Sequence, residues 1–313
     1  MPSLADLIIA DVCPTHRFLE EMTHAIPWTL FEKQLTLHIH HKTGGRPPYP
    51  RLLLFKMSLL KTWFCLSDAQ TEFQCRDRLS FRKFLGLSID DSIPEATTLE
   101  NFRQELRETG LDVGLIDTLD DFFNEQGILL TEGNLVDASF IRANCRPKKD
   151  PEAQSDLDAD HGHKGFGYSA TVNVDRGTKL IRRANTTSER PHDSQQMEAV
   201  IVGDEQEVFG DTAYACKAEW LEAQGIKARM TKKRARKKKW GDTPPLSFRD
   251  QYLNKVWAGC RAPVEHIFAC WKTVFGVRRT VYRGLEHVNG HVQALALAYN
   301  LRRWGYLTRG ECV

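Results

Sequence analysis

The sequence predicts an α/β protein in which an all-helical N-terminal domain precedes a domain built around a β-sheet. Apolar residues between positions 46 and 127 recur at the three- and four-residue spacing of helices. From residue 128 the pattern changes to short apolar runs, and residues 168–174 alternate apolar and polar side chains like a half-buried strand. We therefore expect a lead-in at 1–45, a helical domain at 46–127 and a sheet-containing domain at 128–313.

The helical part of the chain carries recognisable helix starts. Ser67 followed by Gln70 matches a capping box, in which each side chain bonds the other residue's backbone N–H. Thr97 followed by Glu100 matches the same pattern. Apolar spacing predicts helices at 31–37, 52–64 and 111–127.

The second part of the chain mixes strands and helices. The expected elements, in chain order, are a strand ending at Asp137, a strand at 168–174, a turn at 175–177, a strand at 179–184, a helix at 192–200, a strand at 207–209 before Asp211, a helix at 217–224, a basic insertion at about 225–250, and helices at 262–275 and 286–303. Pro263 suits the first turn of the helix at 262–275.

The positive charge of the chain is concentrated in one segment. The 313 residues carry a net charge of only +2. Between Lys227 and Lys239, however, nine of thirteen residues are Lys or Arg. This run predicts a DNA-backbone contact, with a solvated loop as the alternative. The basic residues assigned to it are Lys232, Lys233, Arg234, Arg236, Lys237, Lys238 and Lys239.

Cysteine usage indicates a reducing compartment. None of the eight cysteines forms a Cys-x-x-Cys pair, and their spacing fits no zinc module. The N-terminus lacks the basic region of a signal peptide, and no apolar run is long enough to span a bilayer. We expect a cytoplasmic protein.

Three acidic residues carry the functional prediction. Asp137 and Asp211 each end a strand-like run, and Glu265 lies on a predicted helix. Either aspartate alone would indicate a strand-ending turn. The order strand-Asp, hairpin, strand-Asp, helix-Glu favours a shared site instead. Carboxylates with cations beside them suit two divalent metal ions and a phosphodiester, and therefore DNA strand-cutting and strand-transfer chemistry.

Two cations accompany Glu265 on its helix. Arg261 precedes it by four residues and Lys272 follows on the same side. A surface ion pair between Arg261 and Glu265 is the alternative to a catalytic role.

Several segments together resemble one family. These are the N-terminal stretch from GRPPYPRLLLFKMSLLK to IPEATTLENFRQEL, then VDASFIRA, HKGFGYSATVNVD, HDSQQM, VFGDTAYAC and RAPVEHIFACWK. The chain resembles a bacterial insertion-sequence DDE transposase of the insertion-sequence-five family over nearly its whole length. Arg261, Glu265 and Lys272 are similar to the family's Tyr-Arg-Glu-Lys signature, but its Tyr position is Ala258 here.

The resemblance implies a fold and a chemistry. The fold would be a ribonuclease H-like mixed sheet flanked by helices, with Asp137 and Asp211 on adjacent strands and Glu265 on a helix alongside. The three acids would be the catalytic and metal-binding residues for Mg²⁺, with Mn²⁺ as a substitute. Arg261 and Lys272 would hold DNA phosphates. The partners would be double-stranded DNA, at terminal inverted repeats and target, and a second copy of the chain.

Other assignments remain open at this point. His163, His192 and Asp193 could support the metal site; a satisfied histidine and a helix cap by Asp193 are the alternatives. Arg76, Arg78, Arg82 and Lys83 form a basic strip in the helical domain, which is expected to read DNA ends. The rival functions are a nuclease that cuts without joining and an inactive DNA-binding relic or regulator.

Overall fold

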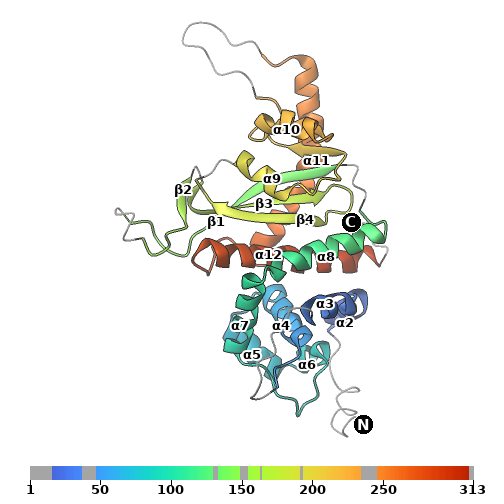
Figure 1. The fold of residues 1–313 in the computed structure, drawn as a ribbon, viewed down its shortest axis with the longest axis vertical. Coiled ribbons are helices and arrows are strands. Elements are labelled where there is room, and N and C mark those ends of the chain that lie inside the picture. Colours follow the sequence, from blue (N-terminus) through green and yellow to red (C-terminus); the bar gives the residue numbers. More distant parts are fainter. Residues whose placement is uncertain are drawn as a thin grey trace. The chain divides into compact units, whose positions relative to one another are not determined.

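The computed structural model describes residues 16–36, 47–129, 133–148, 154–162, 164–190, 193–233 and 245–309 (Figure 1). The chain divides into two compact units, Met1–Thr118 with Gln293–Val313, and Leu119–Val292. Helices α8 (Leu111–Glu125) and α12 (Leu285–Leu307) each contribute residues to both units. Within the described ranges, no helix combines the length and apolar character needed to cross a membrane.

The first unit is helical, as predicted. It contains α2 (Arg17–Ala25), α3 (Trp28–Thr36), α4 (Arg51–Trp63), α5 (Asp68–Asp77), α6 (Leu79–Leu85) and α7 (Ala96–Glu108). Helix α4 is the centre of this unit, because seven of its thirteen residues are buried apolar side chains. The indole of Trp63 donates to the carbonyl of Ala298 at 3.0 Å, and that of Trp304 donates to Ala25 at 2.8 Å. These bonds tie the closing part of α12 to this unit.

One of the two expected capping boxes is present. At α5, the Gln70 N–H donates to Ser67 Oγ at 3.2 Å and the Ser67 N–H donates to Gln70 Oε1 at 2.9 Å. The second expectation is wrong, because α7 is preceded by Glu95 and has no side-chain cap of its own. Instead Glu72, from α5, accepts the N–H of Ala96 at 2.7 Å. A hydrogen bond from another helix thus replaces the local cap at the start of α7.

The second unit is built on one mixed sheet. Its strands are β1 (Asn134–Arg142), β2 (Asp160–Gly162), β3 (Gly165–Asp175), β4 (Ile181–Ser188), β5 (Glu207–Gly210) and β6 (Lys227–Met230). Strand β3 pairs antiparallel with β1, β2 and β4, whereas β5 pairs parallel with β1 and β6 pairs parallel with β5. This order, with flanking helices, is the expected ribonuclease H-like sheet, and the predicted fold class is confirmed (Figure 1).

Helices cover both faces of the sheet. Short helices α9 (Met197–Val200) and α10 (Ala218–Ala223) pack on the face that presents Val136 and Val208. The long helix α11 (Phe248–Thr273) packs on the other face, where Asp137 points, because successive side chains of a strand alternate. Strand β3 is therefore buried on both sides and not half-buried as its alternation predicted.

The region between β5 and α11 differs from the prediction at both ends. Residues 227–230 are strand β6, and α11 begins at Phe248, so the insertion predicted at 225–250 is narrower. Pro263 lies inside α11 rather than in its first turn. A proline there cannot donate to the carbonyl four residues earlier, which belongs to Gly259. The helix continues past Pro263 because the side chains that follow it, Val264, Ile267, Phe268 and Trp271, are buried.

Gly167 is required where β3 meets β1. A Cβ at this position would lie 2.2 Å from the carbonyl oxygen of Ile141 and 2.9 Å from the Ala143 nitrogen. Because both are backbone atoms, Gly167→Ala should force the strands apart and lower stability by about 2 kcal/mol. Urea unfolding would measure the change. Gly114→Ala, a helical glycine with open space around its Cβ, is the control and should not destabilise; equal midpoints for the two variants would contradict the expectation.

Candidate functional site

The sheet register places the two aspartates side by side. Strands β1 and β5 pair in parallel, with Asn134 opposite Val208 and Leu135 opposite Phe209. Continued by two residues, the same register sets Asp137 opposite Asp211 at the end of β5. Residues in register on parallel neighbours point to the same face, which is the face that α11 covers.

Asp137 is the more enclosed of the pair, with its side chain 19% exposed. Oδ1 accepts the N–H of Ala138 at 2.9 Å, and Oδ2 accepts Arg261 Nη2 at 2.7 Å. Burial raises the pKa of the Asp137 carboxyl above its ordinary value. The charge of Arg261 opposes that shift, whereas the negative charge of Asp211 adds to it. The two carboxylates therefore act on each other, as ligands of a shared cation would.

Asp211 is fixed by a local turn. Its Oδ1 accepts the N–H of Ala213 at 2.7 Å, and the backbone turns at Tyr214, whose N–H donates to the carbonyl of Asp211. The small and hydroxylated residues after Asp211 permit this tight turn. One carboxylate oxygen is thereby oriented, and the other stays available.

Helix α11 supplies the cation. The sequence left open an ion pair between Arg261 and Glu265, but Arg261 reaches across to Asp137 instead. Glu265, one helical turn further along, is exposed. The structure thus brings together Asp137, Asp211 and Arg261.

The donors fit a hard divalent cation in kind. Asp137 and Asp211 offer carboxylate oxygens, which Mg²⁺ prefers, on two adjoining strand ends. Across the parts of the chain that the structure describes, no group of three His, Cys, Asp or Glu side chains is gathered closely enough to hold a metal ion. Glu265 would have to turn toward the aspartates to complete such a set.

A second group of cations lies at the far end of α11. Lys272 is half-buried, and burial lowers its pKa. The positive charges of Lys164 and Arg278 lower the Lys272 pKa further. Sequence reasoning missed both neighbours, because Lys164 precedes β3 and Arg278 follows α11. Lys164 and Arg278 therefore lie close enough to Lys272 for their positive charges to act on it.

A hollow of about 780 Å³ opens between the β5–β6 edge and the N-terminal half of α11. Its charged lining is Arg176, Arg229, Lys232, Arg249, Glu207 and Asp250. Both acids are already paired, Glu207 with Arg229 at 2.8 Å and Asp250 with Lys232 at 2.9 Å. The lining is therefore net positive, and no sequence motif predicted it.

Helix α11 runs from this hollow to the aspartates. Trp257 lines the hollow, and Arg261 and Glu265 follow it at intervals of four residues on α11. Cys260, which also lines the hollow, directly precedes Arg261. The surface thus leads from a basic hollow to the aspartate pair.

The remaining predicted residues are mostly outside the described ranges. These are His163, His192, Arg234, Arg236, Lys237, Lys238 and Lys239. Asp193 begins a short 3-10 helix, η2 (Asp193–Gln196). Lys232 pairs with Asp250 at the hollow, and Lys233 is exposed.

The basic strip of the helical unit is not a uniform DNA-facing surface. Arg82 is buried and donates to the carbonyls of Ser88, Ile89 and Asp91, so it holds a turn. Arg76 and Lys83 pair with glutamates. Arg82 is therefore wrongly assigned to the strip.

Comparison with known protein families shows to which family the chain belongs. Residues 129–301 match the family described as "Transposase DDE domain", and residues 8–105 match "Transposase domain (DUF772)". The chain belongs to the DDE transposase family. The order of the two matches is that of the helical and sheet-containing parts of this transposase. Membership implies a phosphoryl-transfer enzyme and divalent metal use in general.

Solved transposase structures resemble the chain at low identity. One is the piggyBac transposase synaptic complex with hairpin DNA, at 11% identity and a TM-score of 0.42, covering 98% of this chain and 76% of that one. A second is the pre-cleavage Mos1 transpososome, at 12% identity and a TM-score of 0.28, covering 99% and 92%.

Proposed function

We propose that this chain is a DNA transposase that cuts at the terminal inverted repeats of its own element and joins the ends to target DNA. The observation that carries the proposal is the aspartate pair on adjoining β1 and β5, with Arg261 against it, in a chain of the DDE transposase family. The insertion-sequence-five resemblance agrees with a bacterial, cytoplasmic enzyme that acts on nucleoid DNA as a homodimer.

Asp137, Asp211 and Glu265 would hold Mg²⁺, with Mn²⁺ as a substitute. The bound metal would supply activation of the attacking oxygen and stabilisation of the leaving oxygen. The protein's own side chains would position the DNA. Asp137 and Asp211 fix the location of the scissile phosphate, and Lys272 with Lys164 and Arg278 would bind a neighbouring phosphate.

The basic hollow fits the DNA strand that leads to this site. Its net positive lining attracts phosphates, and Trp257 offers a face on which a base can stack. Lys232 lines the hollow, and Lys233 follows it in the basic run.

Product mapping tests the proposal. Purified full-length protein would be incubated with a plasmid that carries the gene and its native flanks, in Mg²⁺, Mn²⁺ or Ca²⁺. We expect cuts at the element ends in Mg²⁺ and Mn²⁺, followed by joined products. Cut ends without any joining would identify a nuclease. Specific end binding without cutting in any of these metals would identify a DNA-binding regulator.

Arg249→Gln should weaken DNA binding without changing the fold. Arg249 is exposed at the mouth of the hollow, so its loss removes one phosphate contact and should reduce the salt slope by about one. Fluorescence anisotropy at several salt concentrations measures both quantities. Arg190→Gln is the control, because Arg190 is 80% exposed and lies away from the hollow. Equal salt slopes for the two variants would exclude the hollow as part of the DNA path.

A further inference from the structure

Arg261 holds a proposed metal ligand in this structure. Its Nη2 donates to Asp137 Oδ2 at 2.7 Å, and the two side chains are only 17% and 19% exposed. The other oxygen of Asp137 accepts the N–H of Ala138. Both carboxylate oxygens are therefore engaged by donors of the protein.

The contact between Arg261 and Asp137 places a positive charge beside two neighbouring carboxylates. Asp137 and Asp211 lie on neighbouring strand ends, and their negative charges act on each other. Arg261 provides a positive charge at the pair. A divalent ion at the same oxygens would lie against a guanidinium in a poorly solvated site, where like charges repel strongly. Arg261 at Asp137 and a tightly bound metal ion therefore compete.

The bond to Asp137 leaves other hydrogen-bond donors of the Arg261 guanidinium unused. Within the described residues, its Nε is buried without a hydrogen-bond partner, and the bond to Asp137 is the one that its side chain makes. A phosphate group can accept two parallel bonds from a guanidinium, which is a better match for the unused donors. The basic hollow begins at the preceding residue, Cys260, so DNA in the hollow brings phosphates within reach of Arg261.

We infer that Arg261 couples DNA binding to metal binding. Without DNA it occupies Asp137 and weakens the metal site; a DNA phosphate draws it away and lets the aspartates take up the divalent ion. Metal would then bind tightly only when DNA is in place. The inference rests on the proposed function, because it takes Asp137 as a metal ligand and DNA as the substrate.

Metal affinity, independent of activity, tests this coupling. Mn²⁺ binding to the full chain would be followed by the loss of the free-ion paramagnetic resonance signal, with and without saturating duplex from the element end. For the wild type we expect DNA to tighten Mn²⁺ binding about tenfold or more. Arg261→Gln should bind Mn²⁺ tightly without DNA and gain little from adding it. Lys255→Gln removes an exposed charge from the same helix and should behave like the wild type.

Thermodynamic linkage gives a second readout, because Mn²⁺ must tighten DNA binding by the same factor as DNA tightens Mn²⁺ binding. Mn²⁺ affinity of Arg261→Gln equal to or below that of the wild type, in the absence of DNA, would overturn the inference. Asp137→Asn separates this failure from failure of the proposed function. If Asp137→Asn with saturating duplex binds Mn²⁺ as tightly as the wild type with duplex does, the aspartate pair is not the metal site at all.

Discussion

Asp137→Asn is expected to reduce strand cleavage by more than about a hundredfold while leaving the fold and DNA binding in place. Asparagine keeps the size of the side chain and an oxygen that can accept the Ala138 N–H. It removes the negative charge that a divalent ion needs. Burial raises the pKa of the Asp137 carboxyl, so the ionised group is costly in the unliganded fold, and this cost offsets part of the loss of its bond to Arg261. Single-turnover cleavage of an end-containing duplex measures the loss, and anisotropy measures DNA binding.

Asp211→Asn should show the same loss, since its amide oxygen can still accept the Ala213 N–H and preserve the turn. Glu222→Gln is the matched control: it removes one exposed carboxylate from α10, and its cleavage rate should equal that of the wild type. Cleavage within a few-fold of the wild type in both aspartate variants would remove these residues from the proposed site.

Much of the fold could be predicted because its signals are local. Helical spacing located α4 and α8, and the Ser67–Gln70 capping box located the start of α5. The failures have non-local causes. Thr97 does not cap α7 because the helix already begins at Ala96, whose N–H is bonded by Glu72 of another helix. The burial of β3 on both faces depends on strands and helices that its own alternation cannot reveal.

The site was predictable only in part, for a similar reason. Aspartates that end strand-like runs are visible in sequence, and the resemblance indicated that the strands adjoin. The partner of Arg261 was not visible, because the rule for helical neighbours favoured Glu265 and the actual partner, Asp137, lies 124 residues away. The hollow is formed by β5, β6, α11 and the segment after β3, so no single stretch of sequence predicts it.

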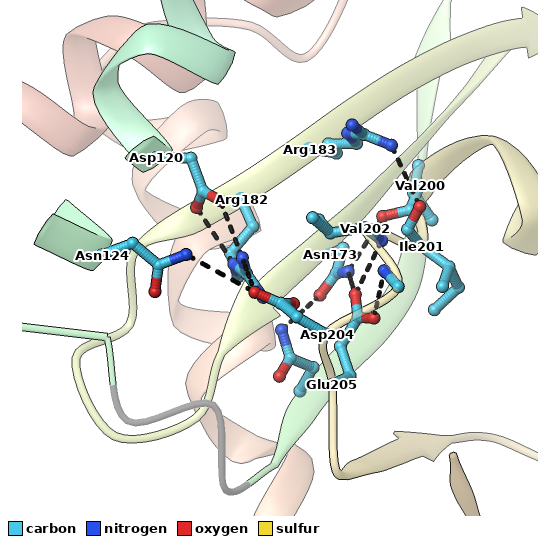
Figure 2. A network of polar contacts seen from close by, with 12 residues as sticks. Asp120, Asn124, Asn173, Arg182, Arg183, Val200, Ile201, Val202, Asp204 and Glu205 are labelled. Carbon is cyan, nitrogen blue, oxygen red and sulfur yellow. Dashed lines mark hydrogen bonds and ion pairs between the residues drawn. The ribbon is translucent and has the colours of Figure 1, made fainter. Parts of the chain in front are cut away.

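A buried polar network joins α8 to the sheet and should dominate stability of the second unit (Figure 2). Arg182 of β4 is fully buried. It donates to Asp120 of α8 at 3.0 and 2.7 Å and to Asp204 at 2.5 and 2.9 Å. Both contacts are two-bond forks, the geometry that guanidinium and carboxylate groups favour.

The two carboxylates respond differently to the same arginine. Burial raises the pKa of Asp120 despite the bonds from Arg182, because its side chain is only 9% exposed. Hydrogen bonds from Arg182 lower the pKa of Asp204, whose side chain is 41% exposed. Of the two carboxyl groups, Asp120 is therefore the one that most needs the positive charge of Arg182 in order to stay ionised.

Arg182→Met should destabilise the second unit by about 3–5 kcal/mol at neutral pH, because it leaves the Asp120 charge buried without a counter-ion. Amide hydrogen exchange in β3 and β4, measured across a urea series, would report this unit separately from the helical one. The double variant Arg182→Met with Asp120→Leu is the control. It removes the stranded charge as well and should recover much of the loss; no recovery would mean that packing of the arginine stem, not its charge, holds α8 to the sheet.

The effect of Arg182→Met should also depend on pH. Burial already raises the folded-state pKa of Asp120 in the wild type, and loss of Arg182, whose hydrogen bonds and charge lower that pKa, raises it further. A group with a raised folded-state pKa favours folding below its unfolded pKa, and this contribution is lost as pH rises through the folded pKa. In the wild type, the lowered pKa of Asp204 has the opposite sign, and its contribution fades as pH falls. The stability difference between wild type and variant should therefore narrow from neutral toward acidic pH, and a constant difference across that range would show that Asp120 keeps its proton state without Arg182.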